Sequence, residues 1–324
     1  MTHELNRWFR AHLKWILLVL LCPWTAQAGQ WRWALGAQID PASHGIIDLG
    51  YRNGGYSVEF LTDTLDLRYR GRLEKGQWDI GLRAALFGAE LLFSPWQDNK
   101  PAPEDALRAS YLGIDLSRAW WLGDGYYAAL AAEYRLYQFG QWDESTRDIP
   151  KERGRLRTAV KVGRWHSELR AQFMAGYVRD GGFDGWWFEG KLSKPRGVGL
   201  GIWNQTHFGW SHGLTRLSKF RLGGLNPYVI PFAGLGWAQF WVERYAVQRV
   251  GLGYKAHDEA FDLTAGLDLG VWDQERMRVS PVMAASVDFG DNSLAASGGI
   301  VMTEEAELGV HGWSAFVWYE RSWR

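Results

Sequence analysis

The segment Tyr127–Tyr137, with the sequence YAALAAEYRLY, indicates the fold of this chain more clearly than any other. Every second residue is apolar or aromatic, and these residues are Ala128, Leu130, Ala132, Tyr134 and Leu136. The charged residues Glu133 and Arg135 lie between them, so they project from the opposite face of a β-strand. Strands of soluble proteins are usually about 5–6 residues long, whereas a tilted strand that crosses a bilayer needs about 9–11. The segment therefore predicts a transmembrane β-strand.

Similar segments recur along the chain and predict an all-β fold, an antiparallel transmembrane β-barrel over residues 29–324. About 17 segments qualify, from Gln30–Asp40 to Gly309–Ser322, and they include Phe232–Tyr245. Bacterial single-chain barrels have an even number of strands, so we expect about 16 strands, or else about 14.

The connections between these segments differ in length. The three longest, Phe93–Asp105, Phe139–Arg153 and Gly209–Pro231, are expected on the outer side of the membrane. Short turns such as Glu74–Gly76, together with Trp272–Glu275, are expected on the periplasmic side. Long outer loops and tight periplasmic turns are typical of outer-membrane barrels.

The first 28 residues resemble a cleavable secretory signal. A basic region with Arg7, Arg10 and Lys14 precedes a short apolar run and the small-x-small pattern of Ala26–Ala28. The apolar run is too short to span a bilayer, which argues against a membrane anchor. Cys22 lacks the small neighbours that lipoprotein processing favours. Since Cys22 is the only cysteine, the mature chain is expected to form no disulfide and no thiolate metal site.

Composition excludes several classes of function. The formal net charge is +0, which argues against a nucleic-acid partner. No phosphate-cradling loop is present, and the acidic turn Asp288–Asn292 lacks the ligand spacing of a calcium site, so we expect no cofactor and no metal.

Tryptophan is abundant, with 21 residues, and many lie near the ends of the expected strands. An indole ring favours the headgroup region of a bilayer, where its N–H can still meet water. We therefore expect two aromatic girdles, formed by Trp31, Trp33, Trp78, Trp120, Trp121, Trp165, Trp187, Trp210, Trp237, Trp272, Trp313 and Trp323.

Charged residues on the polar faces of the strands are expected to line the lumen, because a midplane arginine facing lipid costs about 2–4 kcal/mol. The expected lumen charges are Arg68, Arg70, Arg157, Lys161, Arg170 and Glu243. Two interpretations remain open: paired charges that stiffen the wall, which we favour, or the lining of a selective hydrated channel.

One segment departs from the strand pattern. Phe220-Arg221-Leu222-Gly223-Gly224 leads into a stretch that holds Pro227 and Pro231, and a segment with Glu243 follows. This resembles the long loop and following strand of the bacterial surface-antigen family, which includes the outer-membrane assembly factor and two-partner secretion pores. The resemblance implies a 16-stranded barrel with a long loop folded into the lumen. Phe220, Arg221, Gly223, Gly224, Pro227 and Pro231 would belong to that loop.

The resemblance has limits. Tyr228-Val229-Ile230 stands where the family has an Arg-Gly-aromatic motif at the loop tip. The family's periplasmic repeat domains are not expected here, since the barrel begins near Gln30. Outer-membrane barrels typically end in an aromatic residue that the assembly machinery reads, whereas here Arg324 follows Trp323. Outer-membrane lipid and the outer-membrane assembly machinery are the expected partners, and no periplasmic partner is indicated.

Two classes of function follow. We expect a non-enzymatic outer-membrane barrel that serves protein or solute passage or assembly. The alternative is an outer-membrane enzyme acting on lipids through His166 with Ser167 and Glu168, or through His207 with Ser211 and His212. Adjacent strand residues point to opposite faces, so His166 and Ser167 cannot simply pair. A soluble exported β-sandwich is a third interpretation, and the strand lengths argue against it.

Overall fold

We describe a computed structural model of the chain. The residues that it describes are 29–39, 44–61, 64–91, 96–97, 100–101, 108–139, 152–166, 169–194, 196–215, 218–225, 230–233, 235, 240–258, 260–273, 277–301 and 312–323. The expected signal, Met1–Ala28, lies outside them and stays a prediction.

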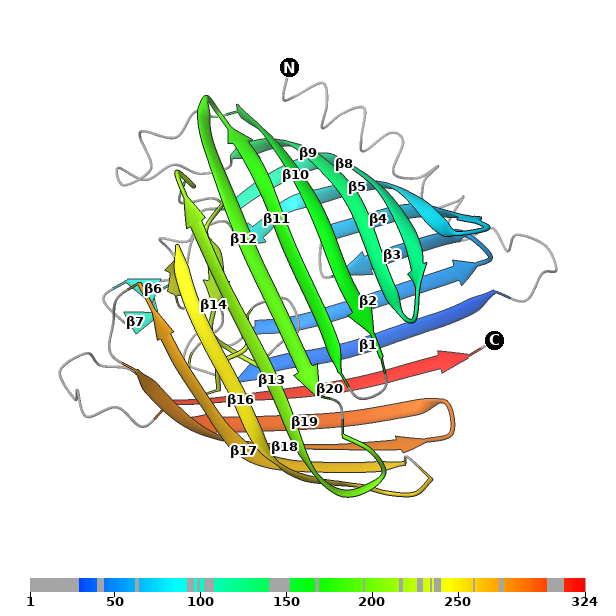
Figure 1. Ribbon diagram of the computed structural model, residues 1–324, viewed down its shortest axis with the longest axis vertical. Coiled ribbons are helices and arrows are strands. Elements are labelled where there is room, and N and C mark those ends of the chain that lie inside the picture. The colour runs from blue at the N-terminus through cyan, green and yellow to red at the C-terminus, as the bar shows by residue number, and fades with distance from the viewer. Residues whose placement is uncertain are drawn as a thin grey trace.

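Within these described residues, sixteen antiparallel strands form one closed barrel (Figure 1). They are β1 (Gln30–Ile39), β2 (His44–Asn53), β3 (Tyr56–Leu61), β4 (Thr64–Leu73), β5 (Gly76–Leu91), β8 (Arg108–Gly123), β9 (Tyr126–Phe139), β10 (Glu152–Trp165), β11 (Arg170–Asp180), β12 (Phe183–Lys194), β13 (Gly199–His212), β16 (Arg244–Lys255), β17 (Phe261–Trp272), β18 (Arg278–Phe289), β19 (Asn292–Ile300) and β20 (Trp313–Trp323). Four short strands lie outside the wall: β6 (Trp96–Gln97), β7 (Lys100–Pro101), β14 (Phe220–Leu222) and β15 (Phe240–Val242).

The first and last strands close the barrel. β1 pairs with β20 from Trp31 opposite Trp323 to Ile39 opposite Ala315. Each other wall strand pairs with its neighbours in chain order, so the wall has no free edge. The prediction of a transmembrane barrel of about 16 strands is confirmed.

One of the expected wall strands is not a wall strand. Within the described part of Phe232–Tyr245, Phe240–Val242 forms a separate short strand, β15, which pairs with β14 away from the wall, and Arg244 and Tyr245 begin the wall strand β16. The alternation in this segment buries Phe232 and Val242 inside the molecule instead of facing lipid. With one wall strand fewer before it, the connection Trp272–Glu275 follows a strand that runs in the opposite direction to the one expected, so it falls at the other rim of the barrel. The prediction that this connection is periplasmic, on the side of the tight turns, was therefore wrong.

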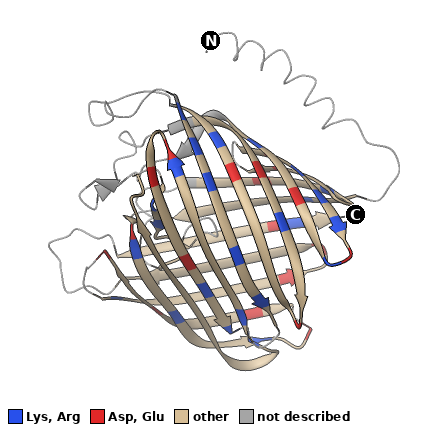
Figure 2. Cartoon of the chain, turned by 45° about the horizontal axis from the view of Figure 1, so that its top comes forward, with Lys and Arg blue, Asp and Glu red and all other residues tan. Residues whose placement is uncertain are grey.

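The side chains alternate as expected. On β9, Leu130, Tyr134 and Leu136 are 51%, 48% and 47% exposed, whereas Tyr137 is only 1% exposed. Exposed apolar residues continue this outer surface on both neighbouring strands, including Ile114 on β8 and Val160 on β10. An apolar outer face and a polar inner face are what a barrel wall in a bilayer requires. Figure 2 shows the charged residues spread along the wall strands.

Three polar residues are an exception on the outer face. By strand register, Asn204 and Thr206 of β13 share the outer face with Gln248 of β16. The Thr206 hydroxyl donates to Gln248 Oε1 at 2.5 Å, and Gln248 Nε2 donates to Asn204 Oδ1 at 2.7 Å. Because each amide finds a partner in this cluster, the cost of placing it against lipid falls.

The two rims of the barrel differ. Tight turns such as Gly54–Gly55, Asp124–Gly125 and Gly290–Asp291 join strands at one rim. The opposite rim carries the longest connection, residues 213–243 between β13 and β16. No helix among the described residues is long and apolar enough to cross a membrane.

The tryptophans only partly follow the expected girdles. Trp31, Trp121, Trp165, Trp210, Trp313 and Trp323 are exposed near strand ends. Trp187 and Trp272 are only 3% and 2% exposed, so assigning them to a girdle was wrong. Both project into the lumen, where they pack against the 213–243 connection. Trp237 lies outside the described residues.

Candidate functional site

The candidate site is the part of the 213–243 connection that enters the barrel; we call this connection the lumen loop. Its strands β14 and β15 pair from Phe220 opposite Val242 to Leu222 opposite Phe240. Beyond β14 the chain turns back on itself, and the Ile230 N–H donates to the Arg221 carbonyl at 2.9 Å. Figure 1 shows β14 within the ring of wall strands.

The Gly-Gly pair of the sequence motif makes this turn possible. Gly223 and Gly224 have φ angles of 117° and 90°, in a region that L side chains rarely adopt. The Gly223 N–H donates to Ile230 O at 3.0 Å, and the Gly224 carbonyl accepts from Phe232 N–H at 3.1 Å. Both glycines are buried, so the turn lies inside the barrel and is held by main-chain bonds.

A carboxylate at the rim holds the start of the lumen loop. Asp180, at the end of β11, is 1% exposed and forms an ion pair with Arg153 of β10. It also accepts hydrogen bonds from the hydroxyl groups of Thr215 and Ser218 in the loop. Because Arg153 already neutralises this carboxylate, its remaining acceptor capacity serves the loop.

Two further wall residues hold the deeper part of the loop. The side-chain oxygen of Gln38 on β1 accepts from the Leu225 N–H at 3.1 Å. Asp268 on β17 accepts from the Ala233 N–H at 2.8 Å and from Arg249 Nε at 2.9 Å. Both wall side chains are 0% exposed. The loop is therefore tied to both β1 and β17.

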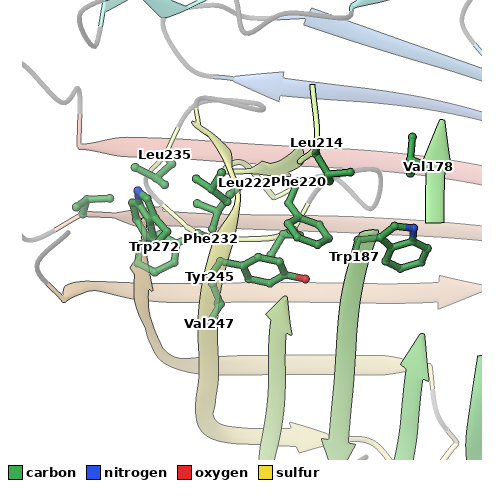
Figure 3. Packing of buried hydrophobic residues seen from close by; sticks show 13 residues of the cluster. Val178, Trp187, Leu214, Phe220, Leu222, Phe232, Leu235, Tyr245, Val247 and Trp272 are labelled. Carbon is green, nitrogen blue, oxygen red and sulfur yellow. The ribbon is translucent and has the colours of Figure 1, made fainter. Parts of the chain in front are cut away.

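Apolar packing adds to these polar contacts. Buried side chains from the loop and the wall form one cluster (Figure 3), which contains Val178, Trp187, Leu214, Phe220, Leu222, Ile230, Phe232, Leu235, Val242, Tyr245, Val247, Trp272 and Val301. The Phe220 ring meets Tyr245 edge-on at 5.1 Å, and Phe232 meets Trp272 edge-on at 5.5 Å. Burying a large apolar side chain contributes about 1.5–3 kcal/mol, against about 1 kcal/mol for a hydrogen bond. The cluster is therefore the larger part of what keeps the loop inside.

A cavity of about 730 Å³ remains between the lumen loop and the wall. Glu133 and Glu189 are the carboxylates among its described lining residues, whereas seven lining residues are basic. These are Arg135, Arg155, Arg157, Lys191 and Arg249 from the wall, with Lys219 and Arg221 from the loop. The cavity is therefore strongly basic.

Several of these basic residues have carboxylate partners. Glu133 lies 2.9 Å from Arg135 and 3.1 Å from Arg155, so one carboxylate serves two arginines. Arg249 pairs with Asp268, and Lys219 pairs with Glu243 at 3.0 Å. Glu189 accepts a hydrogen bond from the Tyr245 hydroxyl at 3.2 Å. Within the described chain, no carboxylate lies within ion-pair distance of Arg157 or Lys191.

A second sector of the lumen, on the other side of β9, is balanced in charge. Arg68 of β4 lies 3.0, 2.9 and 3.4 Å from Asp66, Asp79 and Asp115. Asp79 also pairs with Arg70 at 2.8 Å, and Asp66 pairs with Arg83 at 2.7 Å. These residues belong to the neighbouring strands β4, β5 and β8. The arrangement is the paired, stiffening wall that the sequence suggested.

The remaining predicted lumen charges occupy different places. Lys161 shares the inner face of β10 with Arg157 but does not line the cavity. Arg170 lies at the far end of β11 from Asp180, where its guanidinium is 4.7 Å from the centre of the Trp165 ring. Glu243 lies at the bend before β16 and not in a wall strand. Pro231 lines the cavity, and Pro227 lies outside the described residues.

Of the two residue sets of the enzyme alternative, the described set of His207, Ser211 and His212 does not form a catalytic arrangement. Ser211 and His207 both face inward, but the Ser211 hydroxyl donates to the Glu243 carbonyl at 3.0 Å. His212 is exposed and contacts the Trp186 ring on the outer face. Ser167 and Glu168 lie outside the described residues. Among the described side chains, no three of His, Cys, Asp and Glu converge on a possible metal position.

The sequence interpretation missed the residues that receive the loop, including Asp180, Tyr245, Val247 and Trp272. A signal was nevertheless present. In Tyr177-Val178, Trp186-Trp187 and Val271-Trp272 the alternation breaks, because adjacent residues are both apolar near the same rim. An apolar residue at an inward position of a polar lumen indicates that another part of the chain covers it.

Comparison with known proteins supports the fold. No protein-family model and no curated protein matches the chain in sequence. Among solved structures, BamA from Haemophilus ducreyi lacking POTRA domains 1–3 has a TM-score of 0.68 at 8% identity, over 92% of this chain and 71% of that one. CdiB from Acinetobacter baumannii has a TM-score of 0.62 at 9% identity, over 92% of this chain.

The chain spans 60% of the length of that CdiB. A bacterial polysaccharide outer-membrane secretin also matches, with a TM-score of 0.53 at 8% identity, over 93% of this chain and 99% of that one. At these identities the likeness concerns the fold, and it agrees with the fold that the resemblance to the surface-antigen family implied. A closed barrel of this type with an apolar outer surface belongs in the bacterial outer membrane.

Proposed function

We propose that this barrel serves the passage of a polypeptide or solute across the outer membrane, and that the lumen loop is its gate. The observation that carries the proposal is the seating of the loop. It is tied to Asp180, Gln38 and Asp268 and packed against Trp272 and its neighbours, yet it remains a connection that can leave the lumen without breaking the wall.

The similar folds are consistent with this function. One is a polysaccharide outer-membrane secretin, and two others are BamA and CdiB barrels. A role in membrane-protein assembly or secretion, with the outer-membrane assembly machinery as a partner, belongs to the same proposal. The enzyme alternative gains no support, because the Ser211 hydroxyl is bonded to a main-chain carbonyl and has no described histidine partner.

The gate can be tested by ion conductance. The purified full-length barrel is inserted into planar bilayers and compared with a variant that lacks Leu225–Ile230. We expect small or rare conductance steps from the full-length protein and larger, more frequent steps from the deletion variant, because the deletion removes Leu225 and Ile230, which line the lumen cavity and are hydrogen-bonded to Gln38 and Arg221.

A point variant separates gating from the effects of deletion. Asp180→Ala removes the acceptor for Thr215 and Ser218 at the entry to the loop, so we expect more frequent opening with an unchanged size of the open step. Asp291→Ala, in the exposed turn at the other rim, is the matched control and should behave as the parent protein. Steady, porin-like conductance of the full-length barrel, with no increase on deletion, would overturn the gate.

A further inference from the structure

The basic cavity beside the lumen loop holds more positive charge than its own carboxylates balance. Seven basic side chains and two glutamates line it among the described residues. The chain as a whole has a formal net charge of +0, so this excess is a local accumulation of positive charge. We propose that the cavity binds a soluble ligand that carries several phosphate or carboxylate groups.

Arg157 is the centre of the site on the wall side. Its guanidinium carbon lies 3.9 Å from the centre of the Trp187 ring, and Arg155 occupies the same inner face two residues earlier on β10. Stacking on an aromatic face fixes a guanidinium while its edge N–H groups stay available to an oxyanion. A bound anion would also relieve the repulsion between these two cations.

Lys191 adds a second cation from the wall. It lies on the inner face of β12, two residues after Glu189, and its side chain is exposed to the cavity. An exposed lysine in a cavity holds its charge on a flexible stem, which suits contact with a phosphate oxygen. It contributes little to packing, so replacing it tests charge alone.

The lumen loop supplies the other side of the site. Lys219 and Arg221 line the same cavity as Arg157 and Lys191. The Arg221 guanidinium is 4.8 Å from the centre of the Trp241 ring, an aromatic contact like that of Arg157 with Trp187. Cations on facing surfaces favour a ligand with more than one anionic group, because a single small anion cannot reach both.

The size and position of the cavity narrow the class of ligand. A volume of about 730 Å³ lies within the range of about 300–1,000 Å³ that is typical of small-molecule sites. The site lies inside a wall whose strands are all paired, so a ligand reaches it through the aqueous lumen. A soluble, multiply charged molecule fits these limits, whereas a lipid held in the bilayer does not.

The test is a binding measurement on the full-length barrel in neutral detergent, by isothermal titration calorimetry with tripolyphosphate as the probe and maltotriose as the uncharged control. We expect tripolyphosphate to bind with about one molecule per barrel, with an affinity that falls as sodium chloride is raised. Maltotriose should give no binding.

Three substitutions locate the site. Arg157→Gln and Lys191→Gln should each weaken binding about tenfold or more, the loss expected for one charge-assisted hydrogen bond. Lys161→Gln removes a cation from the same face of β10 but outside the cavity, and should change the affinity less than twofold. If the Arg157→Gln variant folds poorly, the Lys191→Gln variant still tests the site, because Lys191 contributes little to packing.

Equal affinity in all three variants, or binding of maltotriose as strong as that of tripolyphosphate, would overturn the site. The result is independent of the gate. The barrel can bind tripolyphosphate whether or not deletion of Leu225–Ile230 changes its conductance, and the conductance result can hold with no anion bound.

Discussion

The β4–β5–β8 sector and the β10–β12 sector of the lumen both carry arginines, but the partners of these arginines differ. Arg68 lies among three aspartates, whereas Arg157 lies on the Trp187 ring beside other cations. The first sector satisfies its charges within the wall and needs nothing else. The second faces the lumen loop and contains Arg157 and Lys191, for which no carboxylate among the described residues lies within ion-pair distance. Balanced charge stiffens the wall, and unbalanced charge with apolar neighbours marks the side where function is expected.

The strongest test of this comparison concerns the strand between the sectors, because both inner faces depend on its register. Ala132 of β9 faces outward beside Leu116 and Thr158. Ala132→Arg should destabilise the barrel by about 2–4 kcal/mol, since the charge would face lipid. The effect of Leu130→Arg should be smaller. The residue paired with Leu130 on β8 is already an arginine, Arg118, whose guanidinium lies over the Trp120 ring, so the outer face accommodates a positive charge at this depth. Urea unfolding in lipid vesicles measures both.

Ala131→Arg is the matched control on β9, because Ala131 faces the lumen opposite Ser117 and Ala159. Its cost should stay well below that of Ala132→Arg. Equal damage at the two adjacent positions would show that the register is wrong, since a shift by one residue exchanges the two faces.

The second test removes a cation from the balanced sector. Arg68→Gln leaves Asp66, Asp79 and Asp115 close together with one fewer positive charge. We expect a loss of about 2 kcal/mol, below the ~3–5 kcal/mol of a fully buried pair, because the Arg68 side chain keeps 21% exposure. A loss below about 0.5 kcal/mol, the usual limit for surface changes, would contradict this account.

The third test acts on the turn of the lumen loop. Gly224→Ala places a side chain at a φ of 90°, which costs roughly 1–2 kcal/mol. The strain should raise the opening frequency in planar bilayers more than it lowers the stability of the wall, because the turn is not part of the wall. Gly45→Ala is the control, since a Cβ there meets only the Gly36 carbonyl oxygen at 3.9 Å. An unchanged opening frequency in the Gly224→Ala variant would show that the conformation of this turn does not control the gate.

The smallest expected change in stability is that of Arg157→Gln. Arg157→Gln makes the same chemical change as Arg68→Gln, but in the basic sector. We expect a change in stability below about 1 kcal/mol, because the lost contact with Trp187 is offset by weaker repulsion from Arg155. Unfolding in urea under the same conditions as Arg68→Gln gives the direct comparison. Equal losses for the two variants would show that the sectors do not differ in charge balance.

Much of the fold followed from alternation alone. The register of β9 and the number of wall strands could be predicted because lipid accepts apolar side chains and excludes charges at every second position. The inward course of the loop followed from the resemblance carried by Gly223-Gly224. The segment Phe232–Tyr245 could not be placed correctly, since its apolar residues suit a protein interior as well as lipid. The same ambiguity misplaced Trp187 and Trp272.

The sequence by itself determined which residues of a clearly alternating strand such as β9 face lipid, because a period of two is a local property of each strand. Only the tertiary structure decided where the lumen is filled and where charge is left unbalanced. Asp180 meets Thr215 and Ser218, and Arg157 lies across the cavity from Arg221, through contacts between residues far apart in the chain. Such contacts depend on the closure of the barrel, which no single segment encodes.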